Sequence, residues 1–521
     1  MFVEDLKNDF YNVLLGNRVL LLVHYDVDAI CTCKILQGLF KCDNISYTLV
    51  PVGGIAELKQ AYEENNEEIK YVCLVNCGGT IDLVDILQPE EDVVFFVLDC
   101  HKPTDVCNVY SDGQVRLVYK DEEEKIPNFD DIFRDDEDEE EESSRGRDGL
   151  EARAERRRAR RGWEERRDTL MFNYTQFSYY GKPSALVALD LSWLVSRLGP
   201  REAWAGAVAS AAHEAWGARG AAACLLDAAL LTRARSHSSD NVSTLVLEKD
   251  APLPLYRWWS LESALKHSPS IGPFLKLHSL AGVSRLRQLL ADMGFPLQQA
   301  RQAYRSMDVE LRRGLLEALE TAGGRLGLRD VRAHAPPLSA LDAVYATAAL
   351  LEHETIPRSE GFQLALSALD LESQNESLRL GIQSAQQSLE AVARLVNATL
   401  SARALHLAGP FTYFIVHEGT PEAAWVSGPT WLGVAARWAA DAAGARALVA
   451  SAPLDAQRCI MLGVPPRRQE PANLFGAAFS QAAAKSGVSV SLDHVDSSVV
   501  TLPTAQRAQF LDALTALLAD T

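Results

Sequence analysis

The sequence predicts an α/β protein whose amino-terminal part contains a doubly wound parallel β-sheet. Residues 19–23, 71–75 and 93–98 form continuous apolar runs, which are typical of strands buried on both faces. Helix-like stretches separate the strands, so crossovers should join consecutive strands in parallel. A helical middle and a mixed carboxyl-terminal part follow along the chain.

The other elements of this sheet follow in chain order. Residues 31–40 suit a helix after the first strand, and residues 45–52 suit a second strand. Residues 56–64 suit another helix, and residues 114–120 read as a further strand. This alternation is the pattern of a parallel sheet covered by helices.

A sharp change in composition follows the predicted sheet. Residues 135–142 are an unbroken acidic run, whose self-repulsion and lack of apolar residues predict disorder. The run is either a solvated linker or a surface for basic partners. Residues 153–167 form an Arg-rich helical stretch that contains RRRARR. This stretch is either a solvated helix, a nuclear import signal or a partner for the acidic run.

Helical patterns dominate the middle of the chain. Residues 173–231 contain Trp193, Trp204 and Trp216, which we interpret as core rather than as a base-stacking platform because few basic residues separate them. Residues 258–326 form a second helical block and a candidate set of contact helices. Most of its large apolar residues should be core, and an exposed minority could anchor a partner beside nearby arginines. The residues concerned are Phe274, Leu275, Leu289, Met293, Phe295, Leu297, Arg285, Arg287, Arg301 and Arg305.

The last part of the chain mixes helices and strands. Long helices are expected within residues 364–400, and residues 411–417 and 459–464 are strand-like. A closing amphipathic helix places several apolar residues on one face. These are Phe510, Leu511, Leu514, Leu517 and Leu518.

Composition limits the classes of partner. The 521 residues include 51 Lys and Arg against 70 Asp and Glu, which gives a net charge of −19. Tight binding to duplex DNA by charge alone is therefore not expected, whereas basic protein partners fit. No run of eighteen apolar residues occurs, so no membrane span is expected. Of nine cysteines, Cys31, Cys33, Cys73 and Cys77 could suggest zinc, but small buried residues are the favoured interpretation because no CxxC pair occurs.

Polar residues stand where three of the predicted strands end. Asp26 and Asp28 follow the first run, Asn76 follows the second, and Asp99 and His101 follow the third. In open α/β sheets, ligands bind just outside the carboxyl ends of the strands. Oxygen and imidazole groups gathered there are what a pair of Mg²⁺ or Mn²⁺ ions needs to hydrolyse a phosphate ester. Position 76, however, holds Asn where a carboxylate would be expected.

These residues resemble the motifs of a known superfamily. Asp26-x-Asp28, Asn76-Cys77-Gly78 and Asp99-Cys100-His101 are similar to motifs of the DHH phosphoesterases, which include the RecJ exonucleases. Longer segments resemble one branch, the cell division control protein 45 family of eukaryotic replication factors. These segments include VLLLVHYDVDAICTCKILQGLF, YTLVPVGG, LADMGFPLQQARQAYRSMD, GPFTYFIVHEGTPE and the acidic insertion.

The resemblance implies five parts of the chain. Residues 1–130 form a DHH-like α/β domain, and residues 131–168 form an acidic and then Arg-rich insertion. Residues 169–250 complete the DHH-like domain with helices. Residues 251–330 form an inserted all-helical interaction domain, and residues 331–521 form an α/β domain of the DHH-associated type.

The resemblance also implies a function. It predicts a nuclear, non-catalytic subunit of the replicative DNA helicase that bridges the MCM ring and the GINS complex. Replication initiation factors and polymerase-linked fork proteins are further expected partners, together with weak binding of single-stranded DNA. No GxxxxGK[ST] loop occurs, so a partner should supply the ATPase, and no cofactor is expected.

The departures from the active pattern predict loss of phosphoesterase chemistry. Asn76 is neutral and a poor bridging ligand, and the histidine pair is reduced to Cys100-His101. We therefore expect no catalytic, metal or cofactor residues, and a vestigial site at Asp26, Asp28, Asn76, Asp99 and His101. Structural hydrogen bonds are a more favoured role for the two aspartates than one weakly held ion.

Two other functions remain open at this point. One is a residual Mn-dependent phosphodiesterase of RecJ type that acts on single-stranded DNA, which Asp26, Asp28, Asp99 and His101 keep possible. The other is a passive clamp for single-stranded DNA in the old substrate groove, which would require a basic lining.

Overall fold

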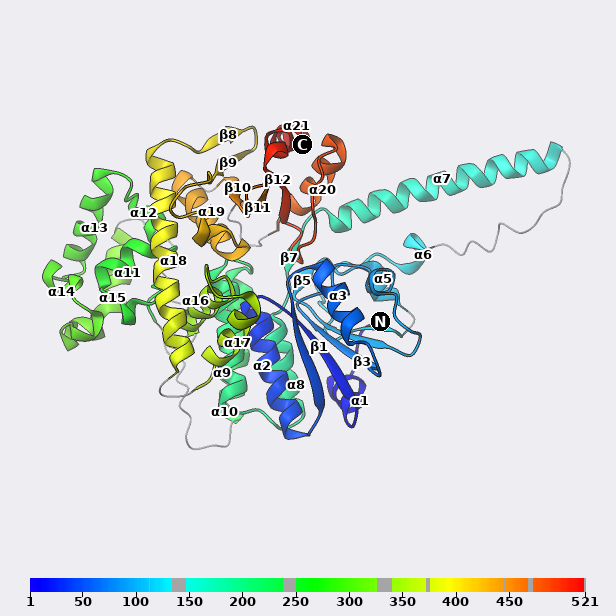
Figure 1. The fold of residues 1–521 in the computed structure, drawn as a ribbon, viewed down its shortest axis with the longest axis horizontal. Coiled ribbons are helices and arrows are strands. Elements are labelled where there is room, and N and C mark those ends of the chain that lie inside the picture. The colour runs from blue at the N-terminus through cyan, green and yellow to red at the C-terminus, as the bar shows by residue number, and fades with distance from the viewer. Residues whose placement is uncertain are drawn as a thin grey trace.

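The structure, a computed structural model, describes residues 1–111, 113–133, 147–237, 250–325, 340–371, 375–444, 446–466 and 472–519 (Figure 1). The predicted acidic run at residues 135–142 lies outside the described residues. Among the described helices, none combines the length and apolar character that crossing a membrane requires.

The amino-terminal part is built on a five-stranded parallel sheet, which confirms the predicted α/β class. The strands lie in the order β2-β1-β3-β4-β6. Every apolar run predicted as a strand contributes one, although β6 is shorter than expected. The strands are β1 (Arg18–His24), β2 (Ser46–Val52), β3 (Tyr71–Val75), β4 (Val94–Leu98) and β6 (Val115–Leu117).

Helices cover both faces of this sheet, and its internal strand β1 alternates its side chains between two cores. Val19, Leu21 and Val23 of β1 face one core, whereas Leu20 and Leu22 face the other. The first core contains residues of α2, α8 and α9, and the second contains residues of α3 and α4. These helices are α2 (Val27–Cys42), α3 (Ile55–Asn65), α4 (Leu83–Leu87), α8 (Ser184–Leu194) and α9 (Pro200–Ala215).

A long helix, α7 (Arg147–Thr175), leaves the body of the molecule beside the sheet (Figure 1). The chain runs along α7 toward the body, where β7 (Tyr179–Tyr180) follows and pairs with β5 (His101–Lys102). The smaller elements nearby are η1 (Leu6–Tyr11), α1 (Asn12–Leu14), α5 (Val106–Tyr110) and α6 (Phe129–Ile132). The prediction that all three tryptophans are core is wrong for Trp193, which is 40% exposed near the end of α8.

The central helices pack around a core of their own. Leu275, Leu289, Met293 and Phe295 are buried in it, whereas the side chains of Phe274 and Leu297 remain exposed. The predicted mixture of core and exposed apolar residues is therefore present. The elements are η3 (Tyr256–Trp258), α11 (Leu261–His267), α12 (Gly272–Leu275), α13 (Leu280–Asp292), α14 (Leu297–Arg301), η4 (Tyr304–Ser306) and α15 (Val309–Arg325). The preceding helix, α10 (Ala221–His237), packs instead on α9 and adds Leu231 to the first core of the parallel sheet.

The carboxyl-terminal part contains a second five-stranded sheet in the order β12-β11-β10-β9-β8. Among its described strands, β9 and β10 pair in parallel and the other neighbours pair antiparallel. The last helix buries Phe510, Leu511 and Leu514, as its amphipathic pattern predicts. The elements are α16 (Ala340–Leu351), α17 (Arg358–Ala368), α18 (Glu376–Ser401), β8 (His406–Ala408), β9 (Phe411–Ile415), η5 (Ala424–Val426), α19 (Pro429–Ala443), β10 (Ala447–Pro453), β11 (Arg458–Val464), α20 (Phe475–Ser486), β12 (Val499–Pro503), η6 (Thr504–Gln506) and α21 (Arg507–Ala519).

The segment before β12 reaches the carboxyl edge of the first sheet. Asp493 accepts a 2.7 Å hydrogen bond from the amide of Ala56 at the start of α3. A Cβ atom on Gly54 would lie 2.2 Å from the Asp493 carbonyl oxygen, so the two segments approach as closely as glycine allows. Tyr180 donates its hydroxyl to Asp496 at 3.0 Å. The second α/β part thus closes over the edge that carries the predicted site.

Candidate functional site at the carboxyl edge of the sheet

The turn from β1 into α2 positions the two aspartates. Asp26 is the N-cap of α2 and accepts a 2.8 Å hydrogen bond from the Ala29 amide, which satisfies one of the free donors of the helix start. Asp28 lies in the first turn of the same helix and is buried. The spacing Asp-x-Asp therefore places Asp26 at the N-cap of α2 and Asp28 in its first turn.

Asn76 connects the two aspartates. It follows β3 in the left-handed region, with φ of 51°, where Asn is more readily tolerated than most residues. Its Nδ2 group donates to Asp28 Oδ2 at 2.9 Å and to the Asp26 carboxylate at 3.2 and 3.3 Å. Its Oδ1 atom accepts a 2.5 Å hydrogen bond from the Ser184 hydroxyl. Every polar atom of this buried side chain therefore has a partner within the protein.

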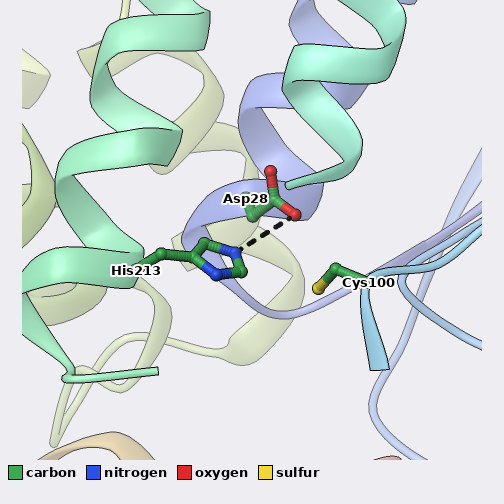
Figure 2. Close-up of side chains that lie close together, drawn as sticks. All are labelled: Asp28, Cys100 and His213. Carbon is green, nitrogen blue, oxygen red and sulfur yellow. Dashed lines mark ion pairs between the residues drawn. The ribbon is translucent and has the colours of Figure 1, made fainter. Parts of the chain in front are cut away.

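The carboxylate of Asp28 connects α2 to the start of α8 and to α9. The amides of Ser184 and Ala185, at the start of α8, donate to its two oxygens at 2.9 and 3.0 Å. His213 of α9 places Nε2 3.6 Å from Asp28 Oδ2, and Figure 2 shows the two side chains pointing toward each other beside Cys100. Burial alone would raise the pKa of Asp28. The hydrogen bond and charge of His213, with hydrogen bonds from Asn76 and Ala185, hold that pKa below its ordinary value. Burial and the charge of Asp28 raise the pKa of Asp26.

Asp99 and His101 form a second pair at the end of β4. One Asp99 oxygen accepts from the Gly79 amide at 2.8 Å, and the other lies 2.7 Å from His101 Nδ1. Burial opposes charge on the imidazole, but the Asp99 carboxylate outweighs it and raises the pKa of His101 to about 9. His101 lowers the pKa of Asp99 in return, against the effect of burial. The structure thus brings all five predicted residues to this edge, as one linked trio and one adjacent pair.

Sequence reasoning missed several members of the site. Ser184 and His213 contact the predicted residues directly, whereas Tyr180 and His24 pack against His101 with ring centroids 5.1 and 6.4 Å away. Ser184 follows Lys182-Pro183 at a helix start, which is a weak signal. His213 interrupts an Ala-rich stretch, and nothing in its spacing connects it to Asp28.

The residues present do not fit a pair of Mg²⁺ or Mn²⁺ ions. Such a pair needs several carboxylate oxygens with free lone pairs. Protein donors already occupy Asp28 and Asp99, and the oxygen of Asn76 is neutral and accepts from a hydroxyl. The carboxylates accept hydrogen bonds from the protein, and a structural role for Asp26 and Asp28 stays a prediction.

Softer ligands are also close together at this edge. The ligand atoms of Asp28, Cys100 and His213 lie within 4.8 Å of one another, as do those of Asp99, Cys100 and His101. Burial and the charges of nearby aspartates raise the pKa of the Cys100 thiol well above its ordinary value. A soft metal would have to displace the thiol proton and the contact between Asp28 and His213 together.

Comparison with known proteins identifies the family. The family model CDC45 matches residues 19–148 and 119–517. The chain belongs to the CDC45 family. The Cell division control protein 45 homolog of Mus musculus is 36% identical over 569 aligned positions, which cover 99% of this chain and all of the mouse protein. The human homolog is 35% identical over the same extent.

The fold agrees with a solved member of the CDC45 family. The crystal structure of CDC45 from Entamoeba histolytica matches with a TM-score of 0.73 and covers 99% of both chains at 18% identity. All five predicted site residues lie within the part that the CDC45 model matches.

Proposed function

We propose that this chain is a non-catalytic subunit of the eukaryotic replicative DNA helicase, which bridges the MCM ring and the GINS complex during initiation and fork progression. Membership of the CDC45 family supports a role in DNA replication. The observation that carries the non-catalytic part is Asn76, whose amide donates to both aspartates at the position where a carboxylate would hold metal. The energy for unwinding then comes from a partner ATPase.

We propose that assembly uses surfaces away from this edge. We place the main contact domain at residues 251–330, between the DHH-like and DHH-associated parts. Its described residues have their own core and leave Leu280 91% exposed at the start of α13. Initiation factors and polymerase-linked fork proteins are further proposed partners, with weak single-stranded DNA binding. We propose a nuclear location, with the exposed arginines of α7 as an import signal.

Replacing Leu280 by Asp should weaken assembly with purified MCM and GINS at least tenfold, because a charge replaces an exposed apolar anchor. Folding should be unaffected, since Leu280 buries almost nothing. Co-purification of the three components and ATP-dependent unwinding measure the effect. The matched control is Leu407→Asp, an exposed leucine (65%) on β8, which should assemble normally. Equal assembly of both variants would refute the placement of the contact surface.

The purified chain should not cleave single-stranded DNA in the presence of Mn²⁺. The control is Asp26→Asn, because Asn also caps helices and so keeps the start of α2 while it removes a potential metal ligand. Traces of cleavage should be equal in both proteins, as expected for a contaminant. Cleavage by the wild type that Asp26→Asn abolishes would establish instead the phosphodiesterase alternative.

A further inference from the structure

A large groove lies between the two α/β parts, and its lining reaches the hydrogen-bonded edge at Tyr180 and Asp496. Its volume is about 3050 Å³, far above the 300–1,000 Å³ or so of a typical small-molecule pocket. The groove is lined by the loop after β6, by residues 162–174 of α7 and by the α9–α10 junction. Residues of α12, α19 and the end of β11 line it as well. A groove of this size suits a chain molecule rather than a metabolite.

The charges in the groove do not suit a nucleic acid. Among the described lining residues, seven are Lys or Arg and eight are Asp or Glu. Two of the basic side chains are already neutralised, Lys182 by Asp190 and Arg219 by Asp227. A site that follows a phosphate backbone needs a net positive lining. The basic lining required for a passive single-strand clamp is therefore missing from this groove.

The lining instead offers apolar and flat surfaces. Phe177, Leu226 and Phe274 line the groove, and each keeps a large exposed fraction of its side chain. Five tyrosines and several glycine and alanine residues line it as well, so that a backbone can approach closely in places. Exposed apolar groups gathered in a concave surface mark sites of protein interaction. The tyrosines are Tyr119, Tyr174, Tyr179, Tyr180 and Tyr345.

One carboxylate in the groove has no partner of its own. The exposed side-chain carboxylate of Glu214, near the end of α9, makes no hydrogen bond or ion pair with the residues that the structure describes. Burial raises the pKa of Glu214 to about 7, and no nearby cation offsets this effect. A ligand that brings a cation to this position would gain an ion pair with this solvent-exposed carboxylate, whereas a phosphate would be repelled.

We propose that this groove binds an extended polypeptide segment of a partner protein, in which a Lys or Arg that pairs with Glu214 stands among apolar residues. The apolar residues pack on Phe177 and Phe274, and the small residues of the α9–α10 junction admit the peptide backbone. The proposal does not depend on which partner assembly the chain serves.

A random 12-residue peptide library displayed on phage, selected against the full-length protein, tests the proposal. Enriched peptides should share a Lys or Arg flanked by apolar residues. A labelled synthetic copy should bind Glu214→Lys at least tenfold more weakly than wild type, measured by fluorescence anisotropy. Glu214→Lys should keep the wild-type melting temperature because the native carboxylate has no partner in the described structure.

Two controls separate the groove from general attraction to an acidic protein. Glu63→Lys changes the net charge equally at an exposed position on α3 and should bind the peptide as wild type does. A peptide with Glu in place of its Lys should prefer Glu214→Lys to wild type. Equal losses in both protein variants, enrichment without a basic residue, or displacement of the peptide by a 20-nucleotide oligo-dT would overturn the proposal.

Discussion

Replacing Asp28 by Ala should destabilise the packing of α8 and α9 on the sheet by about 3–5 kcal/mol, the range for removing one partner of a buried ionic contact. The change leaves the Ser184 and Ala185 amides, one Asn76 donor and His213 without their acceptor, all in the buried interior. Each such group loses its solvation on folding and regains nothing. Three segments that are distant in the sequence depend on this one carboxylate.

Amide hydrogen exchange at the start of α8 measures this effect locally, which matters because a chain with several cores need not unfold in one step. The Ser184 and Ala185 amides should exchange at least a hundredfold faster in Asp28→Ala. Asp85→Ala, an exposed aspartate on α4, should leave exchange unchanged. Unchanged protection in Asp28→Ala would mean that apolar packing, rather than this network, holds the helices.

The sheet and its edge could be predicted from the sequence because their signals are local. Each continuous apolar run is itself a strand, and the next residues along the chain, such as Asp26 or Asn76, stand where that strand ends. The rule that parallel strands share a carboxyl edge then brings residues from different strands together. Geometry that follows from chain order and strand direction is therefore readable without a structure.

The partners of those residues could not be predicted, because they depend on tertiary packing. Ser184 contacts Asn76 across 108 positions of the chain, and Asp493 contacts Ala56 across 437. No periodicity relates such positions, since each is set by how whole elements dock. β10 and β12 were missed for a similar reason, because their short runs, one rich in Ala, do not stand out from neighbouring helices.

Restoring a carboxylate at position 76 should show how far the site has moved from metal chemistry. Asn76→Asp keeps the shape but replaces a donor that lies 2.9 Å from Asp28 Oδ2 with an oxygen, so that two acceptors face each other. Four carboxyl groups then share one buried edge, at positions 26, 28, 76 and 99. We expect a loss of about 3 kcal/mol in stability, because a buried group loses its partner and a like charge is added.

The effect of Mn²⁺ on the stability of Asn76→Asp shows whether the variant regains a metal site. If the hydrogen-bond network around Asp28 replaced an ancestral site for two metal ions, Mn²⁺ should raise the melting temperature of Asn76→Asp more than that of wild type. The added negative charge would strengthen the binding of a cation there. The matched control is Asn108→Asp, which also removes buried amide donors, here to the carbonyls of Gly78 and Ile81, but has no such carboxylate pair as its partner. Mn²⁺ should not rescue that variant. If Mn²⁺ also fails to stabilise Asn76→Asp, the amides of α8 and His213, and not Asn76 alone, prevent Asp28 from binding a metal ion.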